Sequence, residues 1–78
     1  MLSFQVIEYS RSPAKGIKIY CDAEGMSVLL GALAHLVGER AAHLHLRAPS
    51  AGGNDLEANT PSGSAAVSEV IIDYAEGD

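Results

Sequence analysis

One stretch of the chain combines residue types and spacing that suit chemistry, namely His43-Leu44-His45-Leu46-Arg47. Polar and apolar residues alternate strictly here, which is the pattern of a strand with one buried face. Leu44 and Leu46 are therefore expected to face a core, while the two histidines and Arg47 point the other way. A row of two imidazoles and one guanidinium suits metal binding, proton transfer or contact with a partner.

A metal site is the first chemistry to weigh. Two histidines separated by one residue on a strand present their ring nitrogens on one side, as zinc and copper sites require. A third ligand would have to come from a residue elsewhere, and the candidates are His35, Asp55, Glu57 and Glu69. His35 is expected on the helix side of the sheet and no further Cys or His cluster is present. We therefore predict no bound metal and no cofactor.

Acid–base catalysis would pair His43 or His45 with a carboxylate of the last strand, Glu69 or Asp73. Such a site needs a base, an oriented partner and a pocket that excludes water. A domain of this size with one helix offers little concavity. The chain is therefore not expected to be an enzyme.

A long polar loop follows the histidine row, from residue 48 to about residue 63. Most connections span about 4–6 residues, and longer unstructured loops are usually functional or disordered. Gly52 and Gly53 lack the pattern of a phosphate-binding loop and suit a sharp turn instead. The strand and its exit together form a candidate working surface.

Alternation and turn residues predict the remaining elements. Strands are expected at residues 2–9, 17–21, 43–47 and 66–75 and a helix at residues 23–37. Pro13 and Gly16 mark the turn of a hairpin, Asp22 is a suitable N-cap, and Gly38 is placed to end the helix in a left-handed cap. If the last strand pairs with residues 43–47, Glu69 and Asp73 share the face of the histidines.

The predicted helix has one apolar stripe and one flank of small residues. The stripe, expected to pack on the sheet, comprises Met26, Leu29, Leu30, Leu33 and Val37. The flank comprises Ser27, Gly31, Ala34 and Gly38. His35 is the only ionisable residue between Gly25 and Gly38, so the flank is either a solvent face of small residues or is covered by a second copy in a homodimer.

These elements predict one α+β domain over residues 1–78 with the order ββαββ. We expect a four-stranded, mainly antiparallel sheet with one helix packed on one face. The helix that joins the second and third strands should make a right-handed crossover. The apolar residues expected to face the core are Leu2, Phe4, Val6, Ile17, Ile19, Cys21, Val70, Ile72 and Tyr74.

Composition restricts the partners. Ten acidic and five basic residues give a net charge of -5, which disfavours nucleic acid and favours a basic protein. Cys21 is the single cysteine, which favours a reducing cytoplasm. No signal peptide is expected at the N-terminus, and the apolar stretch 26–37 is shorter than the ~18 residues of a membrane span.

Four segments carry a family resemblance: Asp22-Ala23-Glu24-Gly25, His43-Leu44-His45-Leu46, Pro49-Ser50-Ala51-Gly52-Gly53-Asn54-Asp55-Leu56 and the closing strand from Val67 to Tyr74. With them the chain resembles the immunity protein 32 family of bacterial polymorphic toxin systems. Ala51 stands where such proteins tend to carry an aromatic residue, and Ser68-Glu69-Val70 where a further histidine is expected.

The resemblance implies a cytoplasmic protein that binds and neutralises a cognate toxin by occluding it. The implied contact residues are His43, His45, Arg47, Pro49, Ser50, Gly52, Gly53, Asp55, Leu56 and Glu57. The alternative is a small cytosolic interaction or metal-binding module. Neither reading makes the chain an enzyme.

Overall fold

A computed structural model of the chain describes residues 1–39 and 43–74. The elements are β1 (Leu2–Glu8), β2 (Lys15–Cys21), α1 (Ala23–Gly38), β3 (His43–Arg47), a 3-10 turn (Pro49–Ala51) and β4 (Glu69–Asp73). The predicted α+β class and the ββαββ order are confirmed. The bounds lie within a few residues of those expected, with the last strand shorter at both ends.

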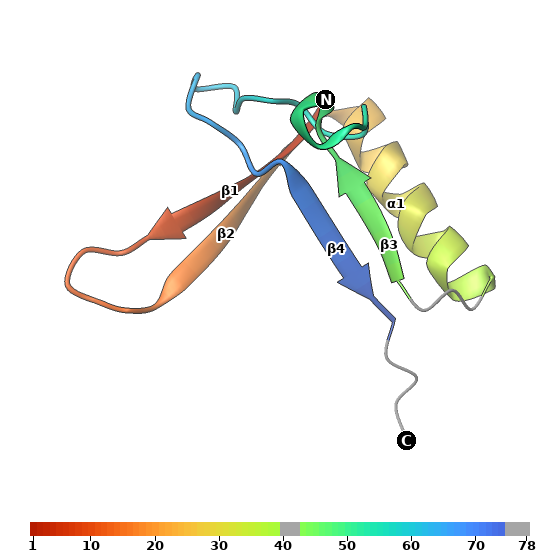
Figure 1. Cartoon of the computed structure of the whole chain (residues 1–78), viewed down its shortest axis with the longest axis horizontal. Helices are drawn as coiled ribbons and strands as arrows, with labels where there is room; N and C mark the ends of the chain where they lie inside the picture. Colours follow the sequence, from red (N-terminus) through yellow and green to blue (C-terminus); the bar gives the residue numbers. More distant parts are fainter. Residues whose placement is uncertain (40–42, 75–78) are drawn as a thin grey trace.

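The strands form two separate antiparallel sheets, so the prediction of one four-stranded sheet is wrong. In the first sheet β1 pairs with β2, from Leu2 opposite Cys21 to Glu8 opposite Lys15. In the second, β3 pairs with β4, from His43 opposite Asp73 to Arg47 opposite Glu69. Figure 1 shows that the two hairpins diverge from a common point near the N-terminus. The expected crossover does not arise because β2 and β3 lie in different sheets.

The edge of β1 that does not pair with β2 explains why the two sheets are separate. The carbonyl of Leu2 accepts from the Glu57 amide at 2.8 Å, and the carbonyl of Phe4 accepts from the Val67 amide at 2.8 Å. Residues of the long loop therefore take the edge positions that a third strand would need. The chain leaves this edge after Val67, and β4 begins at Glu69 in a new direction.

The core lies where the hairpins meet α1. Its buried apolar residues are Leu2, Phe4, Leu46, Ala48 and Leu56. Leu44 and Ile72 pack against it, as the alternation in the two strands predicts. Val6, Ile17, Ile19 and Tyr74 do not, because each is exposed. The prediction that these four residues face the core is wrong.

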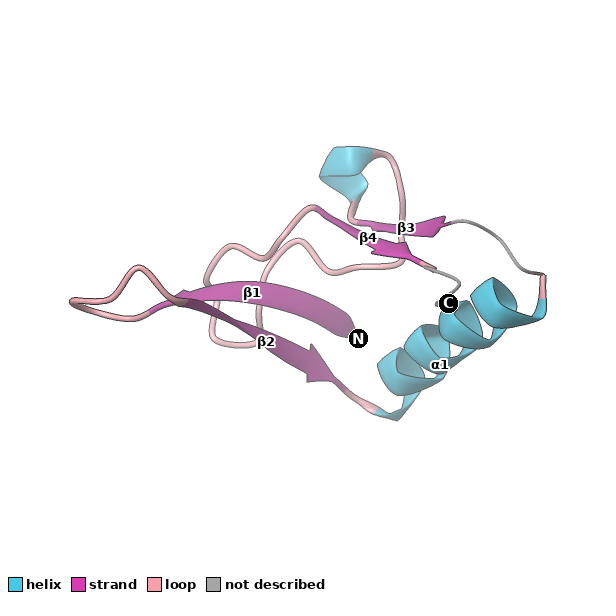
Figure 2. Cartoon of the chain, turned by 90° about the horizontal axis from the view of Figure 1, so that it is seen from below, coloured by secondary structure: helices cyan, strands magenta, loops and turns pink. Residues whose placement is uncertain are grey.

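Helix α1 begins as predicted, because the Asp22 carboxylate accepts from the Gly25 amide at 2.8 Å. It ends at Gly38, which does not have a positive φ, so the left-handed cap expected there does not form. Helix α1 contacts β1, β2 and β3, and Figure 2 shows it at the end of the first sheet and beside the second. No helix within residues 1–39 and 43–74 is long and apolar enough to cross a membrane.

The face of α1 that packs on the core differs from the predicted stripe. Gly25 and Leu36 are buried, and Leu29 and Ala32 are partly buried. The stripe residues that point outward instead are Met26, Leu30, Leu33 and Val37. At Gly25 a Cβ atom would lie 1.7 Å from the Met1 carbonyl oxygen, so the missing side chain lets this face of α1 approach the N-terminal backbone closely.

Candidate protein-binding surface

The outer face of the β3–β4 sheet carries the histidine row, as the sequence predicts. His43 lies opposite Asp73, His45 opposite Ile71 and Arg47 opposite Glu69. Side chains of directly opposed residues share one face of an antiparallel sheet. The six side chains therefore form one surface on the side away from the core, which we call the outer face.

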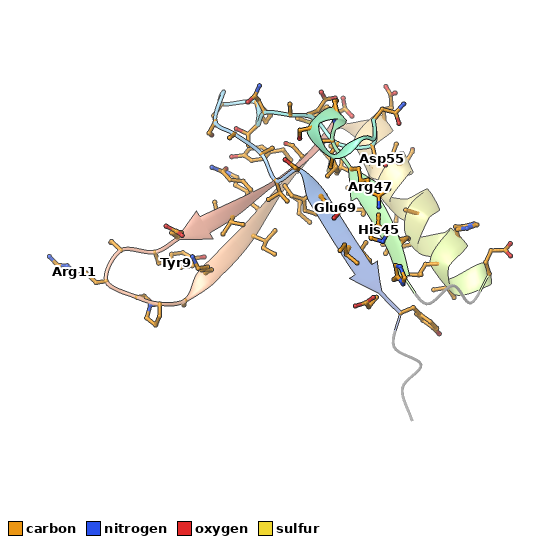
Figure 3. The ribbon with its side chains drawn as sticks, viewed as in Figure 1. Tyr9, Arg11, His45, Arg47, Asp55 and Glu69 are labelled. Atoms are coloured by element: carbon orange, nitrogen blue, oxygen red, sulfur yellow. The ribbon has the colours of Figure 1, made fainter. Side chains whose placement is uncertain are left out.

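Glu69 organises the polar part of the outer face. Its Oε2 accepts from Arg47 Nε at 2.7 Å and lies 3.2 Å from His45 Nδ1 (Figure 3). The hydrogen bond from Arg47, and after it that from His45, holds the pKa of the Glu69 carboxyl below its usual value. Glu69 therefore stays ionised and fixes the directions of both neighbours.

The two histidine rings stand edge to face, with centroids 5.1 Å apart. Within the described residues no three His, Cys, Asp or Glu side chains gather as a metal would require. Asp55 and Glu57 lie on the loop, and His35 is exposed on α1. The arrangement that exists is a carboxylate shared by one imidazole and one guanidinium, which is a fixed ion-pair network.

Ile71 is the apolar member of the outer face. It is 53% exposed and lies in β4 between Glu69 and Asp73, directly opposite His45. A β-branched residue fits the strand by propensity, but its position leaves it uncovered by its own chain. An exposed apolar side chain surrounded by polar ones resembles the centre of a protein interface.

The loop after β3 is fixed against Arg47. The Arg47 carbonyl accepts from the amides of Asp55 and Leu56, at 2.9 and 3.2 Å, and the Arg47 amide donates to Asp55 Oδ2 at 3.2 Å. Leu56 is buried in the core. The Gly-Gly-x-x-Leu part of the family resemblance therefore has a structural role, because it returns the chain to the strand that it left.

The two glycines make this return possible. Gly52 has a φ of +87°, which L side chains rarely adopt. At Gly53 a Cβ atom would lie 2.5 Å from the Cβ of Arg47 and 2.8 Å from its carbonyl oxygen. Both glycines are needed for the shape of the loop, whatever the loop binds.

The remaining predicted contact residues lie in two places. Pro49 and Ser50 are exposed directly after β3, where Ser50 donates to Ser68 at 2.9 Å. Asp55 and Glu57 are also exposed, but they lie beside α1, where they line a pocket together with Glu24 and Val28. Leu56 is buried, so we do not include it among the contact residues. Sequence reasoning missed Ser68, whose only signal is that it directly precedes β4.

Comparisons of the chain with models of protein families, with curated proteins and with solved structures found no match. The function therefore has to be inferred from the surface itself and from the residues that carry the resemblance. The geometry favours a binding surface, because Glu69 is paired with Arg47 and His45 while the apolar side chain of Ile71 is exposed.

Proposed function

We propose that this chain is a non-catalytic immunity protein that binds a cognate bacterial toxin and covers the toxin's active site. The observation that carries the proposal is the outer face, where exposed Ile71 lies beside a row of polar and charged side chains. Energetically dominant positions in protein interfaces are side chains that become fully desolvated, surrounded by groups that exclude water. Ile71 is the side chain on this face that would gain most from burial.

The identity of the partner follows from charge and from the resemblance. A net charge of -5 attracts a basic surface and speeds encounter with it. The resemblance to immunity protein 32 supplies the class of partner, a toxin made by the same bacterium. The proposal includes a cytoplasmic location, which the single Cys21 supports.

The loop after β3 is held in place by its own hydrogen bonds, and this determines how the toxin would be covered. Because Asp55 and Leu56 bind the Arg47 backbone, the exposed residues Pro49 and Ser50 are held beside the outer face before any partner arrives. Preorganised surfaces lose less entropy on binding than mobile ones. Occlusion would thus occur by docking of a preformed surface against the toxin.

Coexpression with a toxin encoded beside the gene tests the proposal. Ile71→Asp places a charge at the centre of the outer face without disturbing the core, and we expect it to abolish protection of growth and to weaken toxin binding by at least about tenfold. Leu30→Asp is the matched control, because Leu30 is exposed to a similar extent but lies on α1. Deletion of the loop is a poorer test because it removes buried Leu56.

Full protection by Ile71→Asp, or the lack of any toxic neighbour that the wild-type chain neutralises, would contradict the proposal. In that case the alternative of a small interaction or metal-binding module applies. Calorimetric titration with Zn²⁺ distinguishes an interaction module from a metal-binding module. Only the metal-binding module would release heat at stoichiometric metal.

We also propose that the chain forms a homodimer through α1. The support is that Met26, Leu30, Leu33 and Val37 form a continuous outward apolar stripe beside the flank of small residues. A helix of a monomer normally shows charged residues to water on such a face. A second copy would cover this stripe and leave the outer face of β3–β4 free.

A further inference from the structure

The β1–β2 hairpin leaves half of its apolar face bare. Leu2, Phe4 and Val6 lie directly opposite Cys21, Ile19 and Ile17, so all six side chains share one face. The pairs near the core are covered, but Val6, Ile17 and Ile19 are 48%, 71% and 47% exposed. We call these three residues the hairpin patch.

A groove of about 450 Å³ runs along the hairpin patch toward the second sheet. Its lining is almost entirely apolar and comprises Phe4, Val6, Ile17, Ile19, Val67, Glu69 and Val70. Exposed apolar surfaces of this kind mark interaction sites.

The chemistry of the hairpin patch favours a second copy over a basic partner. The patch consists of three aliphatic residues and offers no negative charge to a basic surface. The stripe of α1 on a second copy has no ionised side chain either, so both surfaces can lose water without leaving an unpaired charge. Glu69, which also lines the groove, is already bonded to Arg47.

We propose that in this dimer α1 of each copy packs its stripe into the groove of the other copy's hairpin. This inference rests on the proposed homodimer and adds the surface that α1 covers. Two-fold symmetry makes the contact twice, since the hairpin of each copy receives the helix of its partner. Each hairpin thereby gains the helix layer that stable sheets require.

The stripe is long enough to cover the hairpin patch. From Met26 to Val37 the stripe rises about 16 Å, whereas Ile17 to Ile19 in β2 spans about 7 Å. Pairing of two α1 stripes with each other would cover the helices but leave Val6, Ile17 and Ile19 in water. The reciprocal arrangement covers both surfaces at once.

Sedimentation equilibrium tests the dimer first. We expect the wild-type chain to be dimeric, and Ile17→Asp and Leu30→Asp each to be monomeric, since either substitution puts a charge into the contact. Val28→Asp, on the other side of α1, is expected to stay dimeric. Wild-type chain that is monomeric up to about 100 µM would overturn the homodimer and the inference together, since interfaces of standard size bind with Kd values from µM to pM.

Cross-linking then tests the arrangement. In a Cys21→Ala background, chains with Ile17→Cys are mixed with chains with Leu30→Cys and treated with a short bis-maleimide. We expect the covalent dimer in the mixture and little in either variant alone. A dimer in which Leu30→Cys links only to itself would overturn the inference and leave the homodimer standing.

Toxin neutralisation provides an independent readout. Leu30 lies on α1 and not on the outer face, so Leu30→Asp is expected to dissociate the dimer and still protect against the toxin. Sedimentation therefore tests the dimer, and protection against the toxin tests the immunity function, so one proposal can be wrong while the other stands.

Discussion

The two hairpins of this chain are built from the same alternating pattern, yet they bury it to different extents. In β3–β4 the inward residue Leu46 is 4% exposed, the outward residues are mostly polar, and three of them, His45, Arg47 and Glu69, are hydrogen-bonded to one another. In β1–β2 the apolar face is covered only at its base, at Leu2 and Phe4. Alternation thus predicts that a strand has an apolar face but does not tell whether its own chain covers that face.

The difference also separates two kinds of surface. The outer face of β3–β4 has an ion-pair network around Glu69 and one apolar residue, Ile71. Such a surface can exist in water without a partner and suits reversible binding. The hairpin patch has no polar side chain and suits a permanent partner such as a second copy.

The largest expected effect contrasts Leu46→Ala with Ile19→Ala. Leu46→Ala leaves a cavity in the core and should lower the free energy of unfolding by about 2–5 kcal/mol at any protein concentration. Ile19→Ala should cost about 1 kcal/mol or less in dilute protein, where only strand propensity and partial burial are lost. Urea unfolding at two protein concentrations measures both.

The dependence of stability on protein concentration should distinguish Ile19→Ala from Leu46→Ala further. The unfolding midpoint of the wild type should rise with protein concentration, because a partner that binds only the folded state stabilises it. Ile19→Ala should lose that rise, while Leu46→Ala should keep it. Equal costs for the two substitutions in dilute protein would mean that the hairpin patch is already buried in the monomer.

A smaller effect tests which face of α1 packs. At Gly25 an added Cβ atom meets the Met1 carbonyl, so Gly25→Ala should destabilise the fold by about 1–3 kcal/mol despite the better helix propensity of alanine. At Gly31 no atom lies within 4 Å of an added Cβ, so Gly31→Ala should stabilise by up to about 1 kcal/mol. Thermal unfolding monitored by circular dichroism distinguishes the two.

The opposite order of stabilities would place the predicted stripe, not Gly25, against the core. This pair of variants therefore decides whether Leu30 and its neighbours are free for a second copy. It also shows why the sequence pattern was misleading, because a strong apolar stripe is equally compatible with a core and with an interface.

Much of the fold could be predicted because it depends on local signals. Asp22 caps α1 as a short polar residue before an apolar run should, and the His43 to Arg47 alternation gives β3 its bounds and its outward histidines. The separation of the two sheets could not be predicted. It depends on the bonds of Glu57 and Val67 to the edge of β1, which no local pattern encodes.

The candidate site was predictable to a similar degree. The alternation of β4 placed Glu69 on the face of the histidines, and its bond to Arg47 confirms that placement. The loop residues were harder, because Gly52, Gly53 and Leu56 read equally well as parts of a binding loop. Only the contacts with Arg47 and the core show that they fix the loop.

The smallest expected effect concerns acid stability and the ion-pair network of the second sheet. Arg47 and His45 lower the pKa of Glu69 in the folded state, so the ionised carboxyl stabilises the fold above its unfolded pKa of about 4.3. This contribution is lost as the pH falls through the lowered folded pKa. Between about pH 6 and pH 3 the wild type should therefore lose more stability than Glu69→Gln.

Arg47→Met is the matched variant, since it keeps the apolar stem and removes the strongest hydrogen bond to Glu69. It should show a weaker dependence on acid than the wild type, because the pKa of Glu69 then moves back toward its unfolded value. Urea unfolding at several pH values measures the slopes. Parallel slopes for all three chains would show that the network on the outer face is not maintained in solution, and the charged surroundings of Ile71 would then be mobile instead of preorganised.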